Sequence, residues 1–120
     1  MPAACLYLTQ SFIDKHPHTV QALATAIVRA NQWIQKAGPG DIIKTVPETY
    51  LLGDRAVYID AFLAAKGALS PDGLFPAAGA DTARRALASI DPEIGKATID
   101  LKAVYTDDFV RAALLKYPIK

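Results

Sequence analysis

The sequence predicts a mainly α-helical chain with one or two short strands. Apolar residues recur every three or four positions over a long segment after Pro17 and over shorter segments that follow it. Glycine and proline residues separate these segments. The 120 residues, 52% of them hydrophobic, are enough for one domain and too few for two.

Charge and cysteine content exclude several classes of protein. The chain has 13 Lys+Arg against 12 Asp+Glu, so its formal net charge is +1 and no basic surface for a nucleic acid is expected. The single cysteine, Cys5, excludes an internal disulfide framework and a zinc site of the Cys₂His₂ or Cys₄ type. The apolar runs are far shorter than the ~18 residues that span a bilayer.

The N-terminal segment predicts a short strand and then one or two helical turns. The strand is predicted for residues 4–8, where Leu6, Tyr7 and Leu8 are compatible with an extended backbone. Residues 11–16 favour a helix until Pro17 interrupts it. The start of the chain has neither the basic residues nor the long apolar stretch of a secretory signal. The chain as given is therefore expected to be cytoplasmic, or else to be a piece of a longer precursor whose export signal lies upstream.

A long helix is predicted from Pro17 to Ala37. Pro17 suits the first turn, because its missing N–H costs nothing there, and Gly38 and Pro39 end the helix. The predicted buried stripe comprises Val20, Leu23, Ala24, Ile27 and Ile34. The face predicted to lie in water carries Gln21, Thr25, Arg29, Gln32 and Lys36.

The middle of the chain predicts two shorter helical segments and a loop. Residues 41–46 are bounded by glycine and proline and predict one or two turns. A clearer helix follows the Asp54 cap and ends at Gly67. Its predicted buried stripe comprises Val57, Tyr58, Ala61, Phe62 and Ala65. The prolines and glycines of residues 70–79 predict a loop.

The C-terminal third predicts two helices with an extended segment between them. The first helix runs from Asp81, as the cap, to Ile90, with Ala83, Ala86, Leu87 and Ile90 facing inward. Residues 97–103 alternate polar and apolar side chains and predict an extended segment. Thr106 is the predicted cap of the last helix. Its apolar side comprises Phe109, Val110, Ala113, Leu114 and Tyr117.

The histidine and cysteine residues indicate no site. Pro17 splits the pair His16 and His18, and no third soft ligand accompanies them, so we interpret them as a solvated helix start. Cys5 would need an oriented histidine to act as a nucleophile, and we interpret it as a small packed residue. The sequence therefore predicts no metal site and no catalytic residue.

The charged pairs also have structural interpretations. Arg84 and Arg85 could bind a phosphate or carboxylate, but they face away from the predicted apolar stripe and are interpreted as solvated. Asp107 and Asp108 diverge by about 100° on a helix, so they cannot share a proton, and we assign them to the helix dipole. The sequence predicts no cofactor and no enzyme, and it assigns no ligand-binding residue.

Several segments, taken in order, resemble one family of proteins. Residues 11–20 read SFIDKHPHTV, and AIVRANQWI follows on the long helix at 26–34. Towards the other end, IDL at 99–101 precedes YTDDF at 105–109. This series resembles the nitrate/sulfonate/taurine family of ABC-transporter substrate-binding proteins, over about residues 4–117.

The resemblance implies that residues 1–120 form a single incomplete domain, the C-terminal helical part of a two-lobed, type II periplasmic-binding-protein α/β fold. The chain would then be a fragment of the solute-binding component of an ABC uptake system for nitrate, a sulfonate, taurine or a related small organic solute. The implied partners of the full-length protein are a small anionic or zwitterionic solute and an ABC permease, and its implied location is the periplasm. None of the matching segments is a binding motif.

Two other functions stay open. The chain could be a stand-alone helical protein-interaction module without ligand-binding activity, docking through its alanine-rich faces. An enzyme of the thiamine-pyrimidine-synthesis type would share the same fold, but the sequence lacks the cluster of histidines and cysteines that such chemistry would use. In a fragment, the stripe that contains Val57 and Phe62 would need a partner surface, so we also predict that the chain associates with itself, as a dimer.

Overall fold

The computed structural model describes residues 4–51 and 53–119 of the chain. It consists of short and long helices joined by loops, in the order α1 (Gln10–Lys15), α2 (Pro17–Lys36), α3 (Pro39–Thr45), the 3₁₀ turn η1 (Glu48–Tyr50), α4 (Arg55–Lys66), α5 (Ala77–Ala88), α6 (Pro92–Lys96) and α7 (Asp108–Lys116). The residues so described contain no strand.

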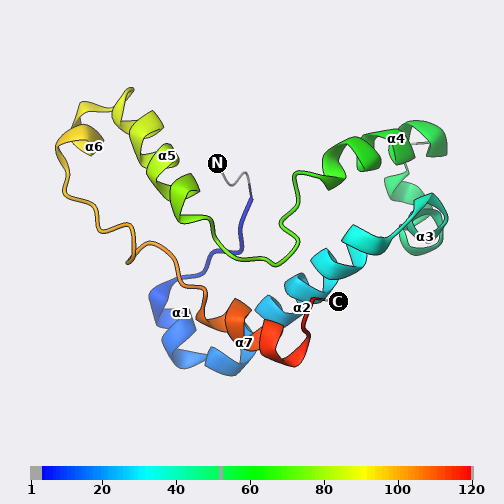
Figure 1. Ribbon diagram of the computed structural model, residues 1–120, viewed down its shortest axis with the longest axis horizontal. Helices are drawn as coiled ribbons and strands as arrows, with labels where there is room; N and C mark the ends of the chain where they lie inside the picture. The colour runs from blue at the N-terminus through cyan, green and yellow to red at the C-terminus, as the bar shows by residue number, and fades with distance from the viewer. Residues whose placement is uncertain (1–3, 52, 120) are drawn as a thin grey trace.

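The helices are arranged as a base with two arms (Figure 1). The base holds α1, α2 and α7, one arm holds α3 and α4, and the other holds α5 and α6. The chain measures 49 × 35 × 27 Å and has a radius of gyration of 17.4 Å. A compact domain of this length would have a radius of gyration of about 14 Å, so the arms are spread well beyond a globular outline.

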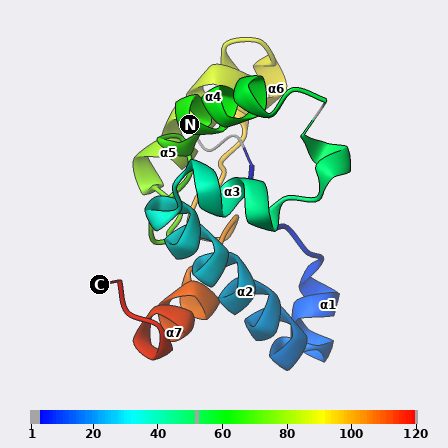
Figure 2. The same ribbon diagram turned by 90° about the vertical axis from the view of Figure 1, so that its right-hand side faces the viewer.

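The base is held by the packing of α2 against α7, which Figure 2 shows side by side. Ala24 and Val28 of α2 and Ala113 of α7 are buried. Two side chains of α2 also bind backbone carbonyls at the far end of the chain: Gln21 Nε2 donates to Phe109 O and Gln32 Nε2 to Tyr117 O, each at 2.8 Å. Apolar contact and directed hydrogen bonds therefore fix α7 on α2.

The loop of residues 70–76 packs on this base. We call this loop, α2 and α7 together the junction. Gly73 has φ +78°, a conformation that side chains disfavour. A Cβ atom there would lie 3.4 Å from Val28 Cγ2 and 3.6 Å from Val110 Cγ1. Phe75 donates its N–H to Asp107 Oδ1 at 3.0 Å and stacks on Tyr105 with 4.5 Å between the ring centroids.

The arm helices have sound local signals but little covering. Asp54 caps α4, its carboxylate accepting from the N–H groups of Ala56 and Val57. Asp91 caps α6 in the same way, through the N–H of Glu93. No residue of α4 is buried, and α5 buries only Gly79 and Ala80. Lys66 Nζ donates to Ala37 O at 3.0 Å and ties the end of α4 to the end of α2.

The fold class predicted from the sequence is wrong in its β content. Residues 4–8 are extended, but the described part of the chain offers them no neighbouring strand. Residues 97–103 contain a turn, in which Asp100 Oδ1 accepts from the N–H of Lys102. A mostly helical chain results, which is not the α/β architecture of the type II periplasmic binding fold.

Several helix boundaries also differ from the predictions. The helix predicted to start after Asp81 begins at Ala77, four residues before Asp81, so Asp81 is no cap. Asp91 and Pro92, predicted to end that helix, instead begin α6. The first turns of α3 start at Pro39, where the ring suits the first helical position. The long helix and its Pro17 start are confirmed, and it ends at Lys36.

Candidate interaction surface

The apolar stripe of α4 is incompletely covered. Val57 is 62% exposed and Ala61 and Ala65 are exposed, whereas Tyr58 and Phe62 are half-buried. The predicted burial of the stripe is therefore wrong for Val57, Ala61 and Ala65 in the chain on its own. Leu63, which the predicted stripe does not include, is also exposed. The helix thus has the apolar residues of a packed helix without the neighbour that would cover them.

The stripe of α5 behaves in the same way. Leu87 is 53% exposed, and Ile90, just beyond the helix, is 83% exposed. Ala86 is exposed as well, and Ala83 is half-buried. The short helix α6 packs against α5 but leaves these side chains uncovered. The sequence predicts all four to face inward, so this prediction is also wrong for the chain on its own.

On α2 the packing follows the predicted stripe only in part, because Val20 and Ala24 are buried but other members are not. Leu23 and Ile27 are exposed, whereas Gln21 and Gln32, predicted to lie in water, face α7 through their hydrogen bonds. Val28, which the predicted stripe omits, is 1% exposed. Leu23 and Ile27 therefore form a third uncovered apolar strip. We call the exposed large apolar residues of α2, α4 and α5 the open faces; they are Leu23, Ile27, Trp33, Val57, Leu63 and Leu87.

The chain exposes more surface than a compact monomer of the same mass. The chain has 8807 Å² of accessible surface. A compact monomer of 12.9 kDa would expose about 6,300 Å². The excess, about 2,500 Å², is roughly three times what one partner buries in an interface of standard size.

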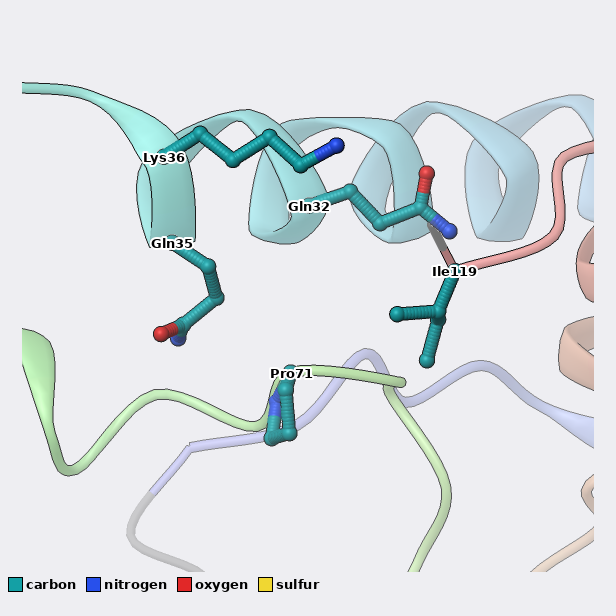
Figure 3. Close-up of a pocket in the computed structure, with 5 residues that line it drawn as sticks. All are labelled: Gln32, Gln35, Lys36, Pro71 and Ile119. Atoms are coloured by element: carbon teal, nitrogen blue, oxygen red, sulfur yellow. The ribbon is translucent and has the colours of Figure 1, made fainter.

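A shallow pocket lies beside the C-terminal end of α2 (Figure 3). Gln32, Gln35 and Lys36 line it from the helix, and Pro71 and Ile119 line it from two loops. Gln32 donates to Tyr117 O, and Gln35 Nε2 donates to Leu69 O at 3.2 Å. The glutamine amides therefore fasten two chain segments to α2, which is a structural role.

The histidine and cysteine residues lie apart from any cluster. Cys5, His16 and His18 are all exposed, and the ring of His16 lies 4.9 Å from that of Phe12. The prediction of Cys5 as a packed residue is therefore wrong. Over residues 4–51 and 53–119, no group of three or more His, Cys, Asp or Glu side chains could hold a metal ion. Within the same ranges no helix is both long and apolar enough to cross a membrane.

The charged pairs serve the fold. Asp81 pairs with Arg84 at 3.3 Å and with Arg85 at 3.0 Å, which neutralises much of the charge on α5. Asp107 accepts the N–H of Phe75 and lies 3.7 Å from Arg111. Asp107 therefore ties the loop to α7, a role beyond the dipole interaction that the sequence predicts.

Comparison with known proteins gives one informative likeness. No protein-family profile matches the chain, and no curated protein matches it either. A solved structure of a protein from Bordetella bronchiseptica RB50 is 50% identical in sequence and superposes with a TM-score of 0.81 over 91% of this chain. The matched region is 34% of the Bordetella chain, so this chain spans about one third of that protein. The name of the structure states no activity.

The resemblance to the nitrate/sulfonate/taurine binding proteins is therefore wrong. It rests on short strings of residues, none specific alone, and the similarity that does extend over the chain points to a protein without a stated function. The helical architecture of the described residues likewise contradicts the binding-protein fold. The classification as part of an ABC-transporter substrate-binding protein is wrong for the same reasons. The solute, the permease, the location and self-association have not been tested and stay predictions.

Proposed function

We propose that this chain is a non-catalytic helical packing module, whose open faces complete a hydrophobic core against another polypeptide surface. That surface corresponds to the part of the Bordetella protein that lies outside the matched third. The proposal develops the interaction-module alternative derived from the sequence. The observation that carries it is the excess of about 2,500 Å² of accessible surface over that of a compact monomer.

The size of this excess favours a permanent partner over a transient one. Transient contacts bury well under 1,000 Å² per partner, whereas obligate assemblies bury up to about 2,500 Å² per partner. The excess therefore has the size of a protein core divided between two chains or two segments. The Bordetella likeness supports the same inference, because two thirds of that chain lie outside the matched region.

The chemistry of the open faces favours a protein core as the partner surface. Their exposed side chains are apolar, and the two arginines on α5 share the carboxylate of Asp81, which leaves one net positive charge. A strongly charged partner surface would therefore find little matching charge there. The shallow pocket beside α2 has no comparable apolar extent, so the open faces are the larger recognition surface.

The test compares this chain alone with the same chain placed in a protein that supplies the missing surface. A chimera is built in which the chain replaces the matched third of the Bordetella protein. Amide hydrogen exchange is then measured on both. We expect the amides of α4 and α5 to exchange at least 100-fold more slowly in the chimera, while those of α2 change less because the junction already protects them.

A pair of neighbouring substitutions provides the control. Val57→Asp places a charge on the open face of α4, and Ala56→Asp places one on a different side of the same helical turn. We expect Val57→Asp to remove the protection of α4 in the chimera and Ala56→Asp to preserve it. If α4 and α5 exchange equally fast in the chimera and in the isolated chain, the proposal is wrong.

A second copy of this chain is the alternative partner for the open faces. Sedimentation equilibrium of the isolated chain distinguishes it, since mutual covering of the open faces would give a discrete dimer of twice 12.9 kDa. A discrete dimer in which α4 and α5 are as protected as in the chimera would replace the proposed partner with a second copy. A monomer, or weak association without that protection, agrees with a heterologous surface.

A further inference from the structure

We propose that residues 4–8 dock by adding a β-strand to the edge of a sheet in the partner surface. This inference rests on the proposed function, because it concerns the same partner. It arises from a different observation, the backbone of the N-terminal segment. That segment is extended and runs between the ribbons of the two arms (Figure 1).

The backbone groups of this segment make no bonds within the described part of the chain. No hydrogen bond joins the N–H or C=O groups of residues 4–8 to any other described residue. The bonds begin at Thr9, whose C=O accepts from the N–H groups of Phe12 and Ile13 at the start of α1. Five successive residues therefore have backbone donors and acceptors without a partner among the described residues, and α1 anchors the end of the segment.

The side chains favour burial of the same segment. Residues 4–8 are Ala, Cys, Leu, Tyr and Leu, without a charge or a proline. Tyr7 is 87% exposed, while Leu6 is 45% exposed and Leu8 is half-buried. Ala4 and Cys5 are exposed as well, so most of this uncharged, largely apolar segment is in contact with solvent in the chain on its own.

A partner that covers the open faces must also supply hydrogen-bond partners for the backbone of residues 4–8, and the edge of a β-sheet can supply them. A surface that packs on both arms also covers the segment between them, and buried backbone N–H and C=O groups need partners. An extended backbone offers these groups at the repeat of a strand, which the edge of a sheet matches. A helical surface would present its own backbone groups already bonded and would leave those of residues 4–8 unpaired.

The test uses proline and alanine at the same positions in the chimera. Proline removes the N–H and blocks a ladder, while alanine removes only the side chain. Neighbouring N–H groups of a strand point in opposite directions, so Leu6→Pro and Tyr7→Pro probe the two edges separately. We expect alternate amides of residues 5–8, those that point toward the sheet edge, to exchange at least 100-fold more slowly in the chimera than in the isolated chain. In at least one of these proline variants, the remaining amides of residues 5–8 should be protected 10-fold less than the same amides in the alanine variant at that position.

The outcomes separate this inference from the proposed function. If α4 and α5 are protected in the chimera but residues 5–8 exchange freely, the strand inference is wrong and the packing module stands. If neither region is protected, the packing module itself fails. The strand would also be overturned if residues 5–8 were as well protected in both proline variants as in Leu6→Ala and Tyr7→Ala. That result would show burial without ladder hydrogen bonds.

Discussion

The junction and the arms are built from similar helices and differ in what covers them. In the junction, α2 and α7 bury Ala24, Val28 and Ala113 against each other, and Gly73 fits into the angle between them. In the arms, α4 has an apolar stripe and a well-formed cap, yet none of its residues is buried. The chain therefore buries more of its junction than of α4 and α5, although the arms bury Ile42, Leu51 and Ala80.

The largest difference between the junction and the arms is expected when the same charge is placed in both regions. Val28→Asp buries an unpaired carboxylate where the native side chain is 1% exposed, and we expect it to cost at least about 4 kcal/mol of junction stability. In the isolated chain Val57→Asp should cost less than about 1 kcal/mol, because Val57 is exposed. Urea denaturation followed by circular dichroism measures both. Equal costs would show that the two regions are equally covered.

A smaller effect is expected from the close approach at Gly73. Gly73→Ala adds a Cβ to a residue with φ +78° and brings it within 3.4 Å of Val28 Cγ2, so we expect a loss of about 2 kcal/mol. Gly67→Ala is the control, because Gly67 has φ −67° and a Cβ added to it would meet no atom within 4 Å. Thermal denaturation should separate the two variants by several degrees. Equal melting temperatures would exclude the loop as part of the junction.

The glutamine contacts on α2 should contribute less again. Gln21→Ala and Gln32→Ala each remove a 2.8 Å hydrogen bond to a carbonyl of the α7 region, and each should cost about 1 kcal/mol. Gln10→Ala removes only an exposed bond to Asp14 and serves as the control. Chemical denaturation of the three variants measures the difference. A loss for Gln10→Ala as large as for the other two would contradict a specific role of the α2–α7 bonds.

The smallest effect on the whole chain is expected from the cap of α4. Asp54→Ala removes the acceptor for two N–H groups and should weaken α4 locally by about 1 kcal/mol. The junction should keep its stability, since the arm adds little to it. Residue-resolved hydrogen exchange measures both regions, with Asp60→Ala as a control in the same helix. Faster exchange throughout α2 would show that the arm and the junction unfold together.

The sequence predicts where helices form better than it predicts what covers them. Pro17 and Asp54 begin helices as expected, because capping and proline geometry are local properties. The burial of α4 and α5 depends on a surface that their own periodicity cannot reveal. The predicted face of α2 is right for Val20 and Ala24. The polar face is wrong at Gln21 and Gln32, because these side chains bind carbonyls 88 and 85 residues away, which no local pattern indicates.

The predictions of the strand and of one helix start fail for related reasons. The Leu-Tyr-Leu run at residues 6–8 is compatible with an extended backbone but supplies no partner strand. Asp81 has the position of a cap before apolar residues, although Ala77 and Ala78 already begin the helix behind Pro76. The interaction surface itself can be predicted in part, since the stripe of Val57 and Phe62 is identified from the sequence as needing a partner.

The order of the elements along the chain has a consequence for synthesis. The two arms lie between α2 and α7, so the ribosome adds 80 residues after Lys36 before α7 ends at Lys116. At about 5–20 residues per second this takes several seconds. Throughout that interval the side of α2 that carries Val28 has no α7 to bind. A nascent chain paused in that interval would therefore offer chaperones an apolar helix that the finished junction conceals.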